Sequence, residues 1–154
     1  MKAVLRVIVL SSIALLLGAC SDADSPETEI RDFIAAAVEA AEARKSSDLA
    51  SMVHAGYQDE NGYNKKQLGS LLRAYFFRHK NIHLFSKIGD IELLGDNQAQ
   101  VRMHVAMAAS VIADIDALSA LRARIYAFEL TLVKQDEWLL HHAKWRPASV
   151  ADLQ

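Results

Sequence analysis

Cysteine, proline and glycine are scarce in this 154-residue sequence, and each scarcity excludes a class of protein. One cysteine rules out an internal disulfide framework, and two prolines with six glycines leave no long flexible linker. The net charge of −2 is too small to indicate nucleic-acid binding, and we identify no basic block after Arg6. Apolar residues make up 52% and charged residues 23%, so we expect one folded globular domain.

The apolar run near the start of the chain is too short for a membrane-spanning helix. It covers residues 7–17 and follows Lys2 and Arg6, whereas a spanning helix needs ~20 apolar residues. A positively charged start, a short apolar run and small residues behind it are typical of a secretory signal.

The only cysteine stands directly behind this run, in Leu17-Gly18-Ala19-Cys20. These four residues resemble the lipobox of bacterial lipoproteins. The resemblance implies cleavage before Cys20, diacylglycerol on its sulfur and a further acyl chain, such as palmitate, on the new amino group. The alternative is an incidental thiol, and the position of Cys20 at the end of a signal argues against it.

The lipobox divides the chain into four segments. We assign residues 1–19 to the signal peptide, 20–25 to the lipidated cysteine and its tether, 26–147 to the domain and 148–154 to a C-terminal tail. Removal of residues 1–19 leaves 15 basic and 19 acidic residues, a net charge of −4, so we expect the lipid alone to provide the anchor. Ser21 follows the cysteine, which by analogy with lipoprotein sorting in enteric bacteria favours the outer membrane, facing the periplasm.

Helical spacing of apolar residues predicts three helices in the first half of the domain. Ser25 caps the first, which ends near Lys45; the second is short; Asn64 caps the third, with Gln67 completing a capping box. Two glycines with Asp and Asn residues predict a loop over residues 54–64.

Alternation of apolar and polar residues predicts four strands in the second half. Their ranges are 82–94, 98–112, 122–134 and 138–145. Strands that follow one another through short turns form an antiparallel meander, so the order of elements predicts an α+β domain. Trp138 and Trp145 are an odd number of residues apart, which predicts that they lie on opposite faces of the last strand.

Two stretches carry a family resemblance. "RKSSDLASMVHAGYQDENGYNKKQLGSLLRAYF" and the closing "DEWLLHHAKW" resemble the nuclear-transport-factor-two-like (cystatin-like α+β) superfamily. The resemblance implies three N-terminal helices packed on a curved, cone-like, four-stranded antiparallel sheet. Such cones often enclose a cavity and often dimerise through the outer face of the sheet.

The same resemblance suggests where chemistry could occur. Enzymes of the superfamily use Asp, His or Tyr side chains that point into the cone, and the candidates here are Tyr57, Asp59, His79, His104 and Glu129. Four of them have a structural alternative: Tyr57 as a core residue, Asp59 as a turn residue, and His104 and Glu129 as polar groups on an outer sheet face. None lies in a motif that matches a catalytic family residue by residue, so we assign no catalytic residue.

The histidines do not predict a metal centre. His79 and His83 have no third ligand nearby in the sequence, and His141 and His142 are expected on opposite faces of a strand. We therefore expect neither a metal nor a cofactor.

The sequence predicts a membrane-anchored, non-enzymatic envelope lipoprotein. Its domain would bind a small apolar ligand or an envelope protein, with the membrane as a partner through the lipid on Cys20. One alternative is a lipid-tethered enzyme of the SnoaL-like or isomerase-like type that acts on a small hydrophobic substrate. Another is a structural role through a homodimer formed by the sheet.

Overall fold

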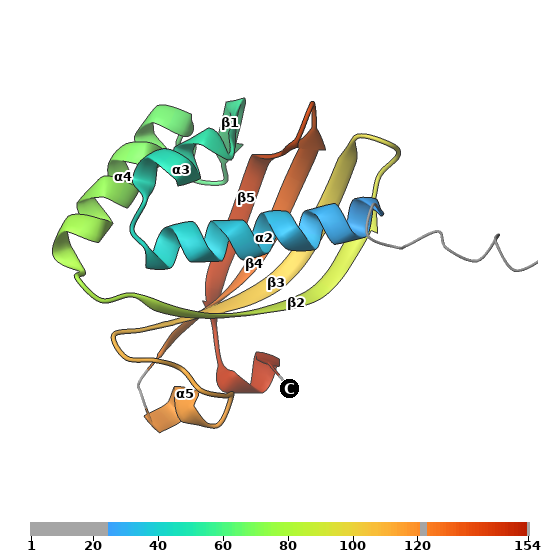
Figure 1. The fold of residues 1–154 in the computed structure, drawn as a ribbon. Helices are drawn as coiled ribbons and strands as arrows, with labels where there is room; N and C mark the ends of the chain where they lie inside the picture. Colours follow the sequence, from blue (N-terminus) through green and yellow to red (C-terminus); the bar gives the residue numbers. More distant parts are fainter. Residues whose placement is uncertain (1–24, 121–122, 154) are drawn as a thin grey trace, which may run out of the picture.

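The computed structural model describes residues 25–120 and 123–153; the predicted signal peptide, Cys20 and most of the tether lie outside them. One mixed sheet, in the order β1-β5-β4-β3-β2, carries helices α2, α3 and α4 on one face (Figure 1). The elements are α2 (Pro26–Glu42), α3 (Ser46–Ser51), β1 (Val53–Asp59), α4 (Lys65–Arg78), β2 (His83–Leu93), β3 (Gln98–Ala108), α5 (Ala117–Ala120), β4 (Arg124–Lys134), β5 (Trp138–Ala148) and η2 (Val150–Leu153).

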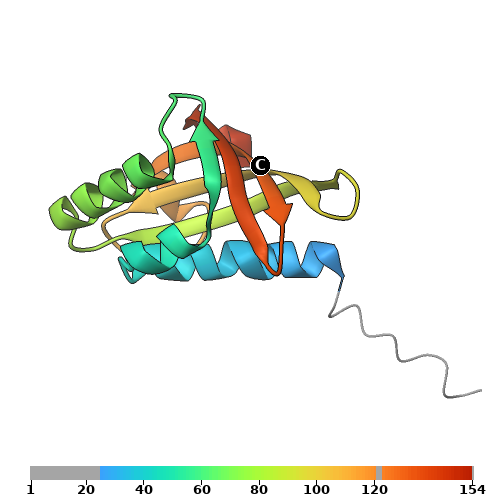
Figure 2. The ribbon, with the colours of Figure 1, turned by 90° about the horizontal axis from the view of Figure 1, so that it is seen from above.

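Helix α2 lies across the inner face of the sheet (Figure 2). Its start is the predicted one: Ser25 accepts a hydrogen bond from the Thr28 N–H, and Pro26 occupies the first turn. Its apolar stripe brings Ile30 and Ile34 into the main core, where they are buried with residues of β3, β4 and β5. Among the described residues, no helix is both long and apolar enough to cross a bilayer.

Helix α4 also begins as predicted. The Asn64 side chain accepts from the Gln67 N–H, and the Gln67 side chain accepts from the Asn64 N–H, each at 3.0 Å. The helix ends at Arg78, next to the exposed His79.

The prediction of a four-stranded, all-antiparallel sheet was wrong, because the sheet has a fifth strand. Strand β1 lies, except for its first residue Val53, within the segment predicted as a loop, and it pairs in parallel with β5. Its register runs from Val53 opposite Leu140 to Gln58 opposite His142, so residues 54–57 bulge out of the pairing. Glycine and turn residues concealed this short edge strand.

The prediction that the two tryptophans lie on opposite faces was also wrong. Thr131 pairs with His142 and Leu132 with Leu140, which leaves His141 as an extra residue in β5. An extra residue reverses the alternation, so both Trp138 and Trp145 face the inner side of the sheet.

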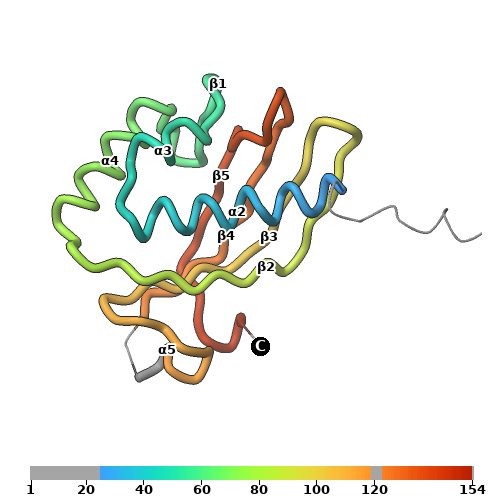
Figure 3. The backbone as a smooth tube through the Cα atoms, viewed as in Figure 1, coloured from blue at the N-terminus to red at the C-terminus, as the bar shows by residue number. Residues whose placement is uncertain are grey.

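The far end of the outer sheet face is covered by the long connection between β3 and β4 and by η2, which lie together below the sheet (Figure 3). Leu118 of α5 and Leu153 of η2 are buried against Ala106 and Ile125. Residues after 147, assigned from the sequence to a tail, thus complete β5 and a small second core.

Candidate ligand-binding site

A cavity of about 400 Å³ lies between the helices and the inner face of the sheet. Helices α2, α3 and α4, strand β1 and all four long strands contribute to its wall. Every lining residue is apolar or aromatic: Phe33, Ile34, Ala37, Val38, Ala41, Leu49, Met52, Val53, Tyr57, Leu68, Leu72, Tyr75, Phe76, Ile82, Leu84, Met103, Val105, Met107, Phe128, Leu130, Leu140, Ala143 and Trp145.

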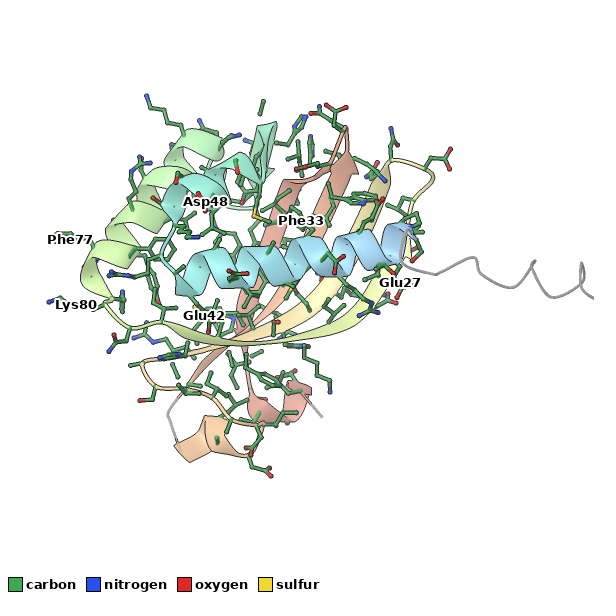
Figure 4. All side chains as sticks on the ribbon, in the orientation of Figure 1. Glu27, Phe33, Glu42, Asp48, Phe77 and Lys80 are labelled. Carbon is green, nitrogen blue, oxygen red and sulfur yellow. The ribbon has the colours of Figure 1, made fainter. Side chains whose placement is uncertain are left out.

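Chain geometry explains this wall. Residues of β3 from Val101 to Met107 alternate, and their inward members face the apolar stripe of α2. Figure 4 shows Phe33 of α2 directed over the sheet. Within the part of the chain that the structure describes, no charged side chain and no histidine lines the cavity. The cavity is therefore suited to an apolar molecule rather than a charged one.

Tyr57 is the predicted site residue that lines this cavity. It is 3% exposed and packs with Val53 and Ala143. Burial raises the pKa of its hydroxyl well above the usual value, and the negative charge of Asp59 raises it further. Tyr57 thus contributes to the wall of the cavity from strand β1.

Asp59 is buried two residues further along β1, on the same face as Tyr57. Its Oδ1 accepts hydrogen bonds from the N–H groups of Asn61 and Tyr63, each at 2.9 Å, which is the turn role considered from the sequence. Its Oδ2 is buried without a hydrogen-bond partner of standard geometry. The structure brings Tyr57 and Asp59 together, but Asp59 is not part of the cavity wall.

His104 and Glu129 lie on the opposite, outer face of the sheet. They line a shallow hollow of about 240 Å³ with Arg102, Lys144 and Arg146 among others. Glu129 is 3.8 Å from Lys144, and the register places it opposite Arg102, so a row of alternating charges crosses the strands.

His79 is exposed beyond the end of α4. Its ring stacks on Tyr75 at 4.1 Å between centroids, and its Nδ1 lies 2.9 Å from the Tyr75 carbonyl oxygen. His141, in the bulge of β5, lies beside His54 with ring centroids 5.1 Å apart. Within residues 25–120 and 123–153, no three His, Cys, Asp or Glu side chains are grouped as metal ligands.

Sequence reasoning missed two aromatic contributors to the cavity. The sequence did not show that Trp145 faces the inner side of the sheet, because the bulge at His141 cannot be seen in the alternation of apolar and polar residues. Phe128 was not singled out, because nothing in the sequence distinguishes a filled core from a hollow one.

No protein-family model and no curated relative match this chain. Solved structures do match. Bd1075 from Bdellovibrio bacteriovorus is 13% identical with a TM-score of 0.64; the match covers 85% of this chain, which spans 44% of Bd1075. A domain of unknown function with a cystatin-like fold from Nostoc punctiforme is 12% identical, with a TM-score of 0.62 and coverage of 82% and 79%.

A ketosteroid isomerase-like protein from Erwinia carotovora is 12% identical with a TM-score of 0.61, and the match covers 82% of this chain and 98% of that one. A protein from Shewanella oneidensis described as NTF-2-like also matches. At these identities the likeness concerns the fold alone. The chain thus has the nuclear-transport-factor-two-like, cystatin-like α+β fold.

Proposed function

We propose that this chain is a lipid-anchored envelope protein whose domain binds a small apolar ligand in the cavity between the helices and the sheet. The observation that carries the proposal is the cavity itself: about 400 Å³, with apolar and aromatic walls. That volume lies in the ~300–1,000 Å³ range of ligand pockets. At ~30 Å³ per water it equals roughly 13 water molecules, which is room for a ligand of about a dozen heavy atoms.

A matched pair of substitutions tests the ligand site. Val105→Phe fills the cavity from the inner face of β3, while Val111→Phe makes the same change at a position that is 70% exposed. We expect an apolar fluorescent probe to bind the wild type and V111F equally, and V105F about tenfold more weakly or worse, a difference of ~1.4 kcal/mol. Equal binding by V105F, with an unchanged circular dichroism spectrum, would place the probe elsewhere.

The anchor is supported by the sequence Leu17-Gly18-Ala19-Cys20. Two or more acyl chains hold a protein stably on a bilayer, and each buried CH₂ contributes ~0.8 kcal/mol. Cys20→Ala should abolish labelling by a clickable fatty acid and leave the precursor uncleaved. Normal labelling and maturation of this variant would disprove the anchor and leave the ligand site unaffected.

The second candidate is a lipid-tethered enzyme of the isomerase-like type, and the buried Tyr57 and Asp59 pair favours it. One similar structure is described as ketosteroid isomerase-like. Against this candidate, Oδ1 of Asp59 is committed to the turn, and His79, His104 and Glu129 lie away from the cavity.

A further inference from the structure

Positive charge is concentrated in one part of this weakly acidic chain. Between Glu60 and Asp90 the sequence contains no Asp or Glu but six lysines and arginines, five of them in or just after α4. The net charge of the whole chain, −2, conceals this segregation. The segment from 61 to 89 therefore carries a net positive charge, although the protein as a whole is acidic.

The cations share the outer side of α4 with an exposed aromatic residue. Lys66, Arg73 and Phe77 are spaced by seven and four residues, so they lie along one helical stripe, and all three are exposed. Phe77 is 88% exposed, more than any other large apolar residue in the part of the chain that the structure describes. Figure 4 shows Phe77 and Lys80 projecting from the same end of α4 away from the body of the domain.

This positive charge has no internal counter-charge. The ion pairs of the described residues lie elsewhere, and none includes Lys65, Lys66, Arg73, Arg78 or Lys80. Arg44 adds a further cation at this end, since its Nη1 donates to the Phe76 carbonyl oxygen at 3.4 Å. An uncompensated cationic surface is complementary to an anionic partner.

We propose that the α4 basic face, formed by Lys66, Arg73, Phe77, Arg78 and Lys80, binds the surface of a bilayer that contains anionic lipids, with Phe77 inserted at the headgroup level. Basic helices with exposed aromatic residues bind membrane interfaces through apolar insertion and attraction to anionic lipids. Protein interfaces, by contrast, are depleted in lysine and have a larger apolar centre. The composition of the α4 basic face therefore favours a lipid surface over a protein as its partner.

This face provides the electrostatic attachment that the net charge of −4 seemed to exclude. The contact between Arg44 and Phe76 places the end of α4 beside the end of α2, whereas the tether joins α2 at its start, at Ser25. The 17 residues of α2 separate the two points by about 25 Å. With the proposed lipid on Cys20, the domain would be held at both ends of α2.

The test places a tryptophan at the proposed contact in the full-length chain. Phe77→Trp is mixed with vesicles of brominated phosphatidylcholine and phosphatidylglycerol, and Leu93→Trp serves as the matched control. Leu93 is also an exposed apolar residue, at 45%, but lies on β2 beside Glu92. The wild-type chain gives the background of Trp138 and Trp145.

We expect the brominated lipid to quench the fluorescence of the tryptophan at position 77. At position 93 we expect no quenching above the background of the wild-type chain. Replacement of phosphatidylglycerol by phosphatidylcholine, or the added changes Arg73→Glu and Lys80→Glu, should remove most of that quenching. Salt at 1 M should also weaken it, because the Debye length falls from ~10 Å to ~3 Å. Three results would overturn the proposal: equal quenching at both positions, quenching at position 77 that does not depend on the lipid charge or on Arg73 and Lys80, or no quenching at position 77. The last result would favour an acidic protein as the partner.

Discussion

The two carboxylate oxygens of Asp59 have different surroundings. One oxygen satisfies two backbone N–H groups of the turn after β1, and the other is buried without a partner. The two hydrogen bonds to Oδ1 fix the orientation of this carboxylate in the turn. The sequence allowed either a turn residue or a cavity residue, and the hydrogen bonds match the turn.

We expect Asp59→Ala to destabilise the fold by about 1–3 kcal/mol, because two N–H groups lose their acceptor. Asp59→Asn retains an oxygen at the same position and should be less destabilising. Urea unfolding monitored by circular dichroism measures both. An unchanged midpoint for Asp59→Ala would show that the turn does not depend on this carboxylate.

Glu29 connects the start of α2 to strands β4 and β5. Its Oε2 accepts hydrogen bonds from Lys134 Nζ at 2.5 Å and from Trp138 Nε1 at 2.8 Å. The hydrogen bond from Lys134, followed by that from Trp138, holds the pKa of Glu29 below its ordinary value of 4.5.

A carboxyl group whose pKa is lower in the folded protein stabilises the fold above its unfolded pKa. That stabilisation is lost as the pH falls from about 4.5 through the folded pKa. We therefore expect thermal melts of Glu29→Gln to depend less on pH in this acidic range than those of the wild type. Glu39→Gln, at an exposed position of the same helix, is the control, and identical pH profiles for all three chains would exclude the effect.

At the scale of elements, the regular parts of the fold were predictable and the irregular parts were not. Ser25 and Asn64 identified two helix starts because their side chains cap the backbone within three residues. Strand β1 was missed because residues 54–57 leave the pairing and interrupt its alternation. A parallel partner 84 to 87 residues away leaves no local trace in the sequence.

The bulge at His141 determines which side chains of β5 face the cavity. We expect deletion of His141 to prevent folding, because one of Trp138 and Trp145 would move to the outer face. His141→Ala keeps the register and should lower the free energy of unfolding by about 1 kcal/mol or less. Tryptophan emission and urea unfolding distinguish the two. A stably folded deletion variant with buried tryptophans would show that the bulge does not set the register.

At the scale of the whole molecule, the cavity depends on how eight elements, α2, α3, α4 and the five strands, pack together. The sequence identified the apolar faces of α2, α4 and β3, and each lies on the cavity wall. It could not show that these faces leave about 400 Å³ between them, because that volume depends on how the elements are spaced. The same holds for the distribution of charge, because the total of −2 gave no indication of the α4 basic face.

Native mass spectrometry of the full protein, extracted gently from the envelope of its own cells, tests the apolar ligand site most directly. We expect the wild type and Val111→Phe to carry a non-covalent apolar molecule that organic solvent removes, and Val105→Phe to lack it. The same adduct on Val105→Phe, or a bare polypeptide in all three preparations, would contradict the account.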